Sequence, residues 1–190
     1  MLDKSIKYYE VIMKREKGTP LLEFNLPEGY RYVMYSPGDE LSWAEIETSV
    51  GEFNKVEDAL EYYSKKYLPY IDELKRRCLF VENSKGKKIA TLTAWWSYTE
   101  KRRDPWLQWF SVMPEYQNKS IGKALVYECM KLLIEIEGDH DVYLPTQTWS
   151  YKAINIYRKQ GFKIIPEKGL GGFKNENYEL AIELLKDYMR

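Results

Sequence analysis

The most constraining feature of this sequence is a strand, a polar turn and a long one-sided helix that follow one another between residues 106 and 138. Residues 106–112 have the composition of a strand, and Pro114 ends it. A polar turn then leads to a helix at 121–137, which Gly138 stops. The apolar residues of this helix recur at threes and fours: Ile121, Leu125, Cys129, Leu132 and Ile136. A strand that feeds directly into such a helix predicts a fold in which helices flank a sheet.

Patterns along the rest of the chain predict further strands and helices. Strands are expected at 8–13, 30–35, 78–82, 88–98, 141–146 and 162–165. Helices are expected after Asp39 as N-cap, at 56–77 with a break at Pro69, and at 150–160 with Ser150 as cap. The tail at 178–189 fits either a helix or a strand. Without a repeat or a linker, the chain is expected to form one domain of mixed α and β structure.

The composition excludes several classes of function. The 190 residues contain 29 Lys and Arg against 29 Asp and Glu, and a binder of nucleic acid or anionic membranes normally carries a basic excess. Two separated cysteines and one histidine exclude a disulfide scaffold and predict no metal site. No run approaches about 18 apolar residues, and the start lacks the apolar segment of a signal peptide. We therefore expect a cytoplasmic protein with no nucleic-acid or membrane partner.

The turn before the long helix has the features of an anion site. Around Ser120, Ile121 and Gly122 the backbone N–H groups of the first helical turn are unpaired, and the helix dipole is positive there. Gly122 presents no Cβ to an approaching phosphate, and Lys119 and Lys123 add positive charge. The same residues are also compatible with an ordinary strand-turn-helix connection that binds nothing.

A second pattern follows this segment by one strand. Residues 150–162 run Ser-x-x-Ala-x-x-x-Tyr-x-x-x-Gly-Phe, and residues 117–122 run Gln-Asn-Lys-Ser-Ile-Gly. In this order the two resemble the GNAT superfamily of acyl-CoA-dependent N-acetyltransferases, whose motifs are Q/R-x-x-G-x-G/A and N-x-x-A-x-x-x-Y-x-x-x-G-F. Ser120 stands where the family usually has glycine, and Ser150 where it often has asparagine. A positive φ at Ser120 would be strained.

The resemblance implies the GNAT fold, an α+β fold with a central, mostly antiparallel mixed sheet flanked by helices. The family-like core covers about 28–166 of a single domain spanning 1–190. Residues 1–27 form an N-terminal extension with an added strand, and residues 167–190 form a C-terminal extension that is a helix or a strand.

The resemblance also implies acetyl-CoA as co-substrate, with no metal. Backbone groups of Val112 and Met113 would pair with the pantetheine arm like an extra strand, and the amides from Asn118 to Ala124 would hold the pyrophosphate. The full candidate binding set is Val112, Met113, Gln117, Asn118, Lys119, Ser120, Ile121, Gly122, Lys123, Ala124, Ser150 and Ala153.

Tyr157 matches the family tyrosine that protonates the departing CoA thiolate. An unperturbed phenol has a pKa of about 10, so it keeps its proton at pH 7. The alternative role is a core tyrosine on one helical stripe with Ala153 and Ile154. Glu100 is the candidate general base, in a loop that also holds Asp104, and His140 is interpreted as a solvated turn residue.

The tryptophans and one charge run leave the acceptor open. Trp95, Trp96, Trp106 and Trp109 fall within one short stretch, where they pack in the core or line an acceptor pocket. The run Lys101-Arg102-Arg103 is interpreted as a solvated loop. Neither feature identifies the acceptor.

These observations together predict an acetyltransferase that moves an acetyl group from acetyl-CoA to a primary amine. The amine is expected to belong to a small molecule and to attack directly in a ternary complex. The alternatives are a catalytically silent acyl-CoA-binding or sensor module on the same fold, and an interaction protein that binds no CoA. The chain is expected to be a monomer or a homodimer.

Overall fold

A computed structural model describes residues 2–189, which fall into two compact units. Among these residues, the first unit comprises 23–94 and 109–132, and the second comprises 2–22, 95–108 and 133–189. The strands β4 (Lys88–Thr99) and β5 (Arg102–Val112) and the helix α4 (Ile121–Glu137) each contribute residues to both units.

The first unit is built on an antiparallel sheet. Strand β2 (Tyr30–Met34) lies beside β3 (Cys78–Asn83), and β4 and β5 follow. The order of strands across the sheet is therefore β2-β3-β4-β5. Tyr32 pairs with Val81, and Leu79 pairs with Leu92. These positions confirm the strands predicted at 30–35, 78–82 and 88–98 to within one residue.

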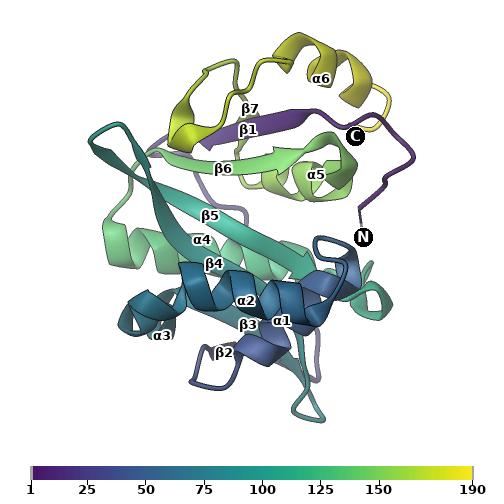
Figure 1. Cartoon of the computed structure of the whole chain (residues 1–190), viewed down its shortest axis with the longest axis vertical. Helices are drawn as coiled ribbons and strands as arrows, with labels where there is room; N and C mark the ends of the chain where they lie inside the picture. Colours follow the sequence, from purple (N-terminus) through teal and green to yellow (C-terminus); the bar gives the residue numbers. More distant parts are fainter. Residues whose placement is uncertain (1, 190) are drawn as a thin grey trace. The chain divides into compact units, whose positions relative to one another are not determined.

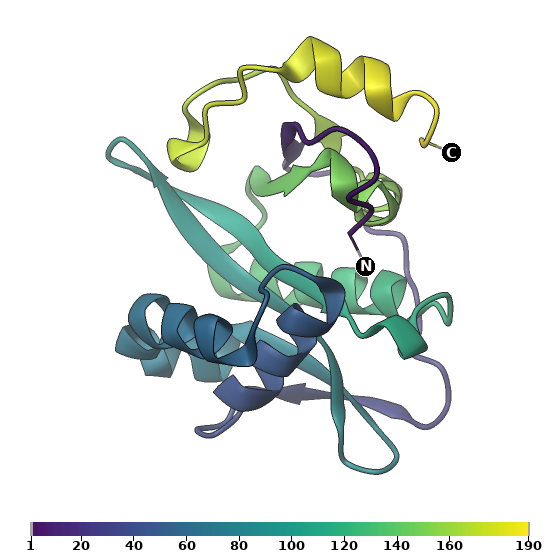
Figure 2. The same cartoon turned by 45° about the vertical axis from the view of Figure 1, so that its right-hand side comes forward.

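Helices cover both faces of this sheet (Figure 1; Figure 2). On one face lie α1 (Glu40–Val50), α2 (Val56–Lys66) and α3 (Ile71–Arg77), and the Tyr63 hydroxyl of α2 meets the Cys78 sulfur. On the other face lies α4, where the Ala124 carbonyl accepts a hydrogen bond from the Tyr32 hydroxyl. Side chains alternate across a strand, so Cys78 and Leu79 serve opposite layers.

Two sequence predictions about these helices concern the break at Pro69 and the N-cap at Asp39. The helix predicted at 56–77 is broken by the 3-10 turn η1 (Leu68–Tyr70), because Pro69 cannot continue the helical hydrogen bonds. Asp39 occupies the N-cap position of α1 without a side-chain cap bond. Its carboxylate instead accepts from the Ser36 N–H and pairs with Lys88.

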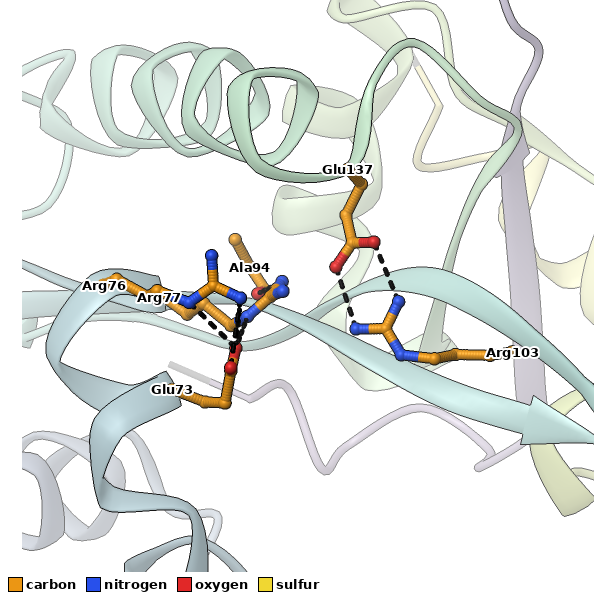
Figure 3. Close-up of polar contacts among 6 residues, drawn as sticks. All are labelled: Glu73, Arg76, Arg77, Ala94, Arg103 and Glu137. Carbon is orange, nitrogen blue, oxygen red and sulfur yellow. Dashed lines mark hydrogen bonds and ion pairs between the residues drawn. The ribbon is translucent and has the colours of Figure 1, made fainter.

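Arg77, at the end of α3, is buried in the first unit. Both Arg76 and Arg77 reach toward the Glu73 carboxylate, and Arg77 Nη1 donates a 3.2 Å bond to the Ala94 carbonyl (Figure 3). A buried guanidinium needs such partners, since an unpaired buried charge is strongly destabilising. The α3–β3 junction is thereby tied to β4.

The second unit holds the other end of the sheet. Its strand order is β5-β6-β1-β7, with β6 at Val142–Gln147, β1 at Glu10–Arg15 and β7 at Lys163–Ile164. β5 meets β6 in parallel at Trp106 and Tyr143, and β1 is antiparallel to both β6 and β7. The seven strands give one mixed, mostly antiparallel sheet, which confirms the predicted fold class.

The first strand of the chain lies between β6 and β7 (Figure 1). Ile12 of β1 is fully buried and clusters with Trp106, Tyr143 and Leu170. The added N-terminal strand is therefore an internal strand of the sheet rather than an appendage. It begins at Glu10, two residues later than predicted.

Two helices belong to the second unit. α5 spans Tyr151–Lys159 after the 3-10 turn η3 (Thr148–Ser150), and α6 spans Tyr178–Leu185 and contacts β1. Ser150 precedes α5 as predicted but makes no side-chain cap bond. The tail left open between helix and strand is helical.

One prediction in the second unit is wrong. β5 begins at Arg102 rather than at residue 106, so Arg102 and Arg103 lie in the strand rather than in a loop, although all three residues of the basic run are exposed as predicted. Arg103 makes a two-pronged ion pair with Glu137 at 2.8 and 2.9 Å (Figure 3). Arg102 pairs with the buried Asp104. The carboxylates of Asp104 and Glu137 pair with the two arginines, and this pairing allows Arg102 and Arg103 to extend the strand.

Candidate active site

The candidate anion segment lies in the first unit, between the end of β5 and the start of α4. After β5, the 3-10 turn η2 (Pro114–Tyr116) leads to Gln117, and α4 begins at Ile121 as predicted. Asn118 and Ser120 adopt positive φ angles of 61° and 64°. Left-handed residues that alternate with ordinary ones turn successive N–H groups to one side, which makes an anion-binding concavity.

The N–H groups of this segment are available to a ligand. Within residues 2–189, the N–H groups of residues 118–122 make no hydrogen bond to a backbone carbonyl, whereas those of Lys123 and Ala124 donate to the Ser120 carbonyl at 3.1 Å. Asn118, Lys119 and Ser120 are exposed, while Ile121 is buried and anchors the helix start. The free N–H groups of residues 118–122 are therefore compatible with a bound phosphate group.

Ser120 has the strained conformation that the sequence analysis anticipated. A left-handed φ costs a residue with a Cβ roughly 1–2 kcal/mol, and asparagine tolerates it better than serine. The segment thus keeps the backbone shape that glycine usually supplies, at some cost in stability.

The two lysines of the segment lie over aromatic rings. Lys119 Nζ is 5.3 Å from the ring centre of Tyr116, and Lys123 Nζ is 5.6 Å from that of Phe24. Both contacts are cation–π interactions on flexible side chains. The ammonium groups remain near the helix N-terminus, where they add to its positive potential.

The backbone proposed to meet the pantetheine arm is only partly available. The Met113 N–H donates to the Ile89 carbonyl at 2.9 Å, and its carbonyl accepts from the Tyr116 N–H at 2.9 Å. The Val112 carbonyl accepts a 2.8 Å bond from Gln117 Nε2. Both backbone groups of Met113 are therefore engaged within the protein, and Gln117 occupies the Val112 carbonyl.

The second motif lies in the second unit, on α5. Tyr157 is 6% exposed, and its ring packs on Phe162 with 5.9 Å between ring centres. Ser150 and Ala153 of the same motif are half-buried. Tyr157 thus has the burial expected of a core tyrosine, while its motif position keeps the proton-donor prediction open.

The sequence-predicted base candidates lie in the second unit. Glu100 is exposed at the β4–β5 turn with a φ of 56°, and Asp104 is buried against Arg102 and Thr99. His140 is exposed in the turn after α4, as predicted. Asp104 is occupied by its ion pair, so Glu100 alone keeps a carboxylate open to solvent.

A family model described as "Acetyltransferase (GNAT) family" matches residues 41–162, which is more than half of the chain. The chain belongs to the GNAT family. This membership supports acyl transfer as its activity, and acetyl-CoA is the family's co-substrate. The resemblance read from the two motifs is thereby confirmed at the level of the family.

Individual relatives are more distant. A curated relative from Sulfurisphaera tokodaii, "N-alpha-acetyltransferase", is 38% identical over 53 residues, which are 28% of this chain and 32% of the relative. A solved GCN5-related N-acetyltransferase from Sphaerobacter thermophilus has a TM-score of 0.63 at 19% identity, over 82% of this chain and 48% of that one. A GNAT acetyltransferase from Colwellia psychrerythraea has a TM-score of 0.59 at 12% identity, over 84% and 54%.

These likenesses extend over part of the relatives only. The GNAT chain described here spans about a third of the curated relative and about half of the two solved structures. At such identities the solved structures show the fold alone.

The described residues offer neither a cluster of metal-ligating side chains nor a membrane-spanning helix. Across residues 2–189, no group of three or more His, Cys, Asp or Glu side chains could hold a metal ion. Over the same residues, no helix is both long enough and apolar enough to cross a membrane.

The sequence analysis missed one pair of buried polar residues in the first unit. Glu47 of α1 is 0% exposed, and its Oε2 accepts a 2.8 Å hydrogen bond from the Ser111 hydroxyl of β5. A signal was present, because Glu47 falls four residues after Trp43 and three before Val50, on the apolar stripe of α1. Glutamate is almost never fully buried in a protein unless it is paired, so a glutamate on the buried stripe of a helix indicates a position with a special environment.

The four neighbouring tryptophans have separate environments. Trp95 stacks on Trp96 in the second unit, with ring centres 4.2 Å apart, and the Arg103 guanidinium lies over Trp96. Trp106 is fully buried in the core of that unit. Trp109 lies in the first unit among the half-buried rings of Phe53 and Tyr62.

Proposed function

We propose that this chain transfers an acetyl group from acetyl-CoA to a primary amine, by direct attack of the amine in a ternary complex. The observation that carries the proposal is the row of unengaged N–H groups at residues 118–122, at the start of α4. These amides would hold the pyrophosphate, whereas the Lys123 and Ala124 amides, also expected to bind it, already donate to the Ser120 carbonyl. Their arrangement suits a phosphate because it combines convergent donors with the positive end of a helix dipole.

The remaining roles follow from the family motifs. An extended pantetheine arm would pair with the backbone of Val112, once Gln117 Nε2 releases the carbonyl that it now occupies. Tyr157 would donate its phenolic proton to the departing thiolate. The neutral thiol is a much weaker nucleophile than the thiolate, so this proton donation disfavours reversal of the transfer.

The acceptor amine is proposed to belong to a small molecule. A second candidate is the α-amine of a polypeptide, because the curated relative is called an N-alpha-acetyltransferase. The two classes separate in a turnover assay that sets a panel of small primary amines against short peptides with free N-termini. Faster turnover of the peptides would transfer the proposal to the second class.

A catalytically silent acyl-CoA-binding module on the same fold remains the alternative function. The strained φ at Ser120 is the observation that favours it, since strain there weakens the cradle. Binding of acetyl-CoA without turnover of any amine would support this alternative. A cytoplasmic location and a monomeric or homodimeric state stay predictions.

Acetyl-CoA binding measured by calorimetry tests the proposal, with desulfo-CoA and ATP as controls. Ligand at about 100 times its dissociation constant should also stabilise the protein by roughly 2.7 kcal/mol in thermal unfolding. The variant Gly122→Leu should fold normally and lose acetyl-CoA affinity, because a side chain would enter the space of the phosphate. Equal affinity in Gly122→Leu would refute the assigned site.

A further inference from the structure

The first unit contains a buried carboxyl group that the proposed reaction does not yet use. Glu47 Oε2 accepts the Ser111 hydroxyl, and Glu47 Oε1 has no hydrogen-bond partner among the described residues. The described residues also give Glu47 no lysine or arginine partner. An ionised carboxylate buried in this way carries a desolvation penalty of several kcal/mol, so its retention at a core position calls for a function.

The environment of Glu47 changes its acidity. Burial raises the pKa of Glu47 to about 8, and the neighbouring Glu52 carboxylate acts in the same direction, while the hydrogen bond from Ser111 opposes them. Another titratable group that interacts with Glu47 is the phenol of Tyr67, at the end of α2. A carboxyl group in this range changes protonation near physiological pH, as a general base requires.

Ser111 lies beside a strained residue of β5. Trp109, two positions earlier, has a φ of 59°, an outlier for a bulky side chain in a strand. Its indole Nε1 donates a 2.6 Å bond to the Tyr67 hydroxyl, and its ring meets Trp43 of α1 edge-on at 5.1 Å. Backbone strain that the surrounding packing maintains gathers at functional sites. Here it occurs three residues before Val112, the backbone proposed to meet pantetheine.

We propose that Ser111 and Glu47 form a proton relay that takes the proton from the acceptor amine before it attacks the thioester. Ser111 would contact the amine, and Glu47 would act through Ser111 as the positioning and proton-accepting residue. The inference rests on the proposed acetyl transfer, and it assigns the base role to Glu47 rather than to Glu100.

The proton transfers balance as follows. The ammonium group gives one proton to Ser111 Oγ while the Ser111 hydroxyl proton passes to Glu47 Oε2, so the carboxylate becomes a carboxylic acid and the amine becomes neutral. The nitrogen lone pair then forms the C–N bond, and the C–S bond breaks. A second proton leaves the nitrogen as one proton reaches the thiolate. The relay proton finally returns to solvent, and this is the net proton that the reaction releases.

The test compares Glu47→Gln and Ser111→Ala with the wild-type chain, and uses Glu45→Gln as the matched control. Glu45 is an exposed carboxylate of the same helix. The amine is the best small-molecule acceptor from the turnover panel. We would measure kcat and KM from pH 6 to pH 9.5, the acetyl-CoA dissociation constant by calorimetry, and folding by circular dichroism.

In Glu47→Gln, kcat should fall by about 100-fold or more, and kcat should no longer rise with pH. In Ser111→Ala, the rise of kcat with pH that remains should shift to higher pH. The reason is that the Ser111 hydroxyl no longer donates the hydrogen bond that stabilises the ionised Glu47 carboxylate. Acetyl-CoA affinity should stay within about threefold in both variants.

Three outcomes would overturn the relay while leaving acetyl transfer intact. They are wild-type kcat and pH profile in folded Glu47→Gln, a change confined to KM, or an equal loss in Glu45→Gln. If Glu47→Gln fails to fold, Ser111→Ala decides, and an unshifted pH profile there rejects the relay. Wild-type protein that binds acetyl-CoA and acetylates no amine would instead refute the proposed function, and the relay with it.

Discussion

The indole Nε1–H of Trp109 donates a 2.6 Å hydrogen bond to the hydroxyl of Tyr67, and this bond holds a strand residue whose φ is 59°. Tyr67 is 4% exposed, so water cannot replace the partner. We predict that Tyr67→Phe lowers the free energy of unfolding by about 1–3 kcal/mol, since it removes the buried hydroxyl that accepts from the indole N–H. Urea denaturation measures this, and Tyr70→Phe, at an exposed tyrosine, is the control. Equal stability of the two variants would contradict the prediction.

The buried Glu47 carboxyl should make stability depend on pH. Burial raises its folded-state pKa to about 8, so between about pH 4.5 and pH 8 the folded state binds more protons than the unfolded state. The contribution of Glu47 is complete below the unfolded pKa and is lost as the pH rises through about 8. We expect the wild type to lose roughly 2–3 kcal/mol more than Glu47→Gln between pH 6 and pH 9. Urea titrations at both pH values check this, and parallel losses would exclude the raised pKa.

The strain at Ser120 predicts a stabilising substitution. Glycine adopts the φ of 64° without a Cβ penalty, so Ser120→Gly should raise the free energy of unfolding by about 0.5–1 kcal/mol after the entropy of the glycine is subtracted. Acetyl-CoA affinity should be equal or tighter. Asn118→Gly is the matched comparison, because asparagine tolerates its φ of 61° better and the gain should be smaller. A destabilised Ser120→Gly would show that the serine side chain contributes more than its backbone costs.

The two interpretations of Tyr157 separate in Tyr157→Phe. If the phenol protonates the thiolate, kcat falls by roughly 10²–10⁴ while the fold survives, since the ring still packs on Phe162. If Tyr157 is a core residue only, turnover stays near the wild-type value. Tyr151→Phe, on the same helix with its ring against Tyr188, controls for loss of a phenol from α5. Steady-state kinetics with the panel amine gives the answer.

A pair of glycines in the second unit tests its packing. A Cβ on Gly171 would lie 2.7 Å from the buried Trp106 ring, whereas a Cβ on Gly169 would meet nothing within 4 Å. Both glycines have positive φ, at 58° and 76°, so the backbone strain of an alanine is common to the two. Gly171→Ala should therefore be less stable than Gly169→Ala by about 1–3 kcal/mol in thermal unfolding. Equal melting temperatures would show that Trp106 moves without cost.

The long helix is the element that local sequence predicts most fully. Its bounds of Ile121 and Glu137 agree with the expectation, because its apolar stripe and Gly138 are both local signals. Pro69 likewise breaks its helix through backbone chemistry that needs no distant partner. The beginning of β5 is different, since Arg102 and Arg103 enter the strand through pairing with Asp104 and Glu137. The partner Glu137 is 34 residues away from Arg103, and no local pattern announces it.

The amino-acid sequence by itself determined the mixed fold, the bounds of the long helix and the family, because each leaves a signal in residues close together in the chain. The start of α4 at Ile121 is one example of such a local effect. Only the tertiary structure decided that β1 lies inside the sheet between β6 and β7, and that Glu47 meets Ser111 across 64 residues. Strand neighbours and buried polar pairs are fixed by packing between distant segments, and periodicity within one segment carries no record of its partner.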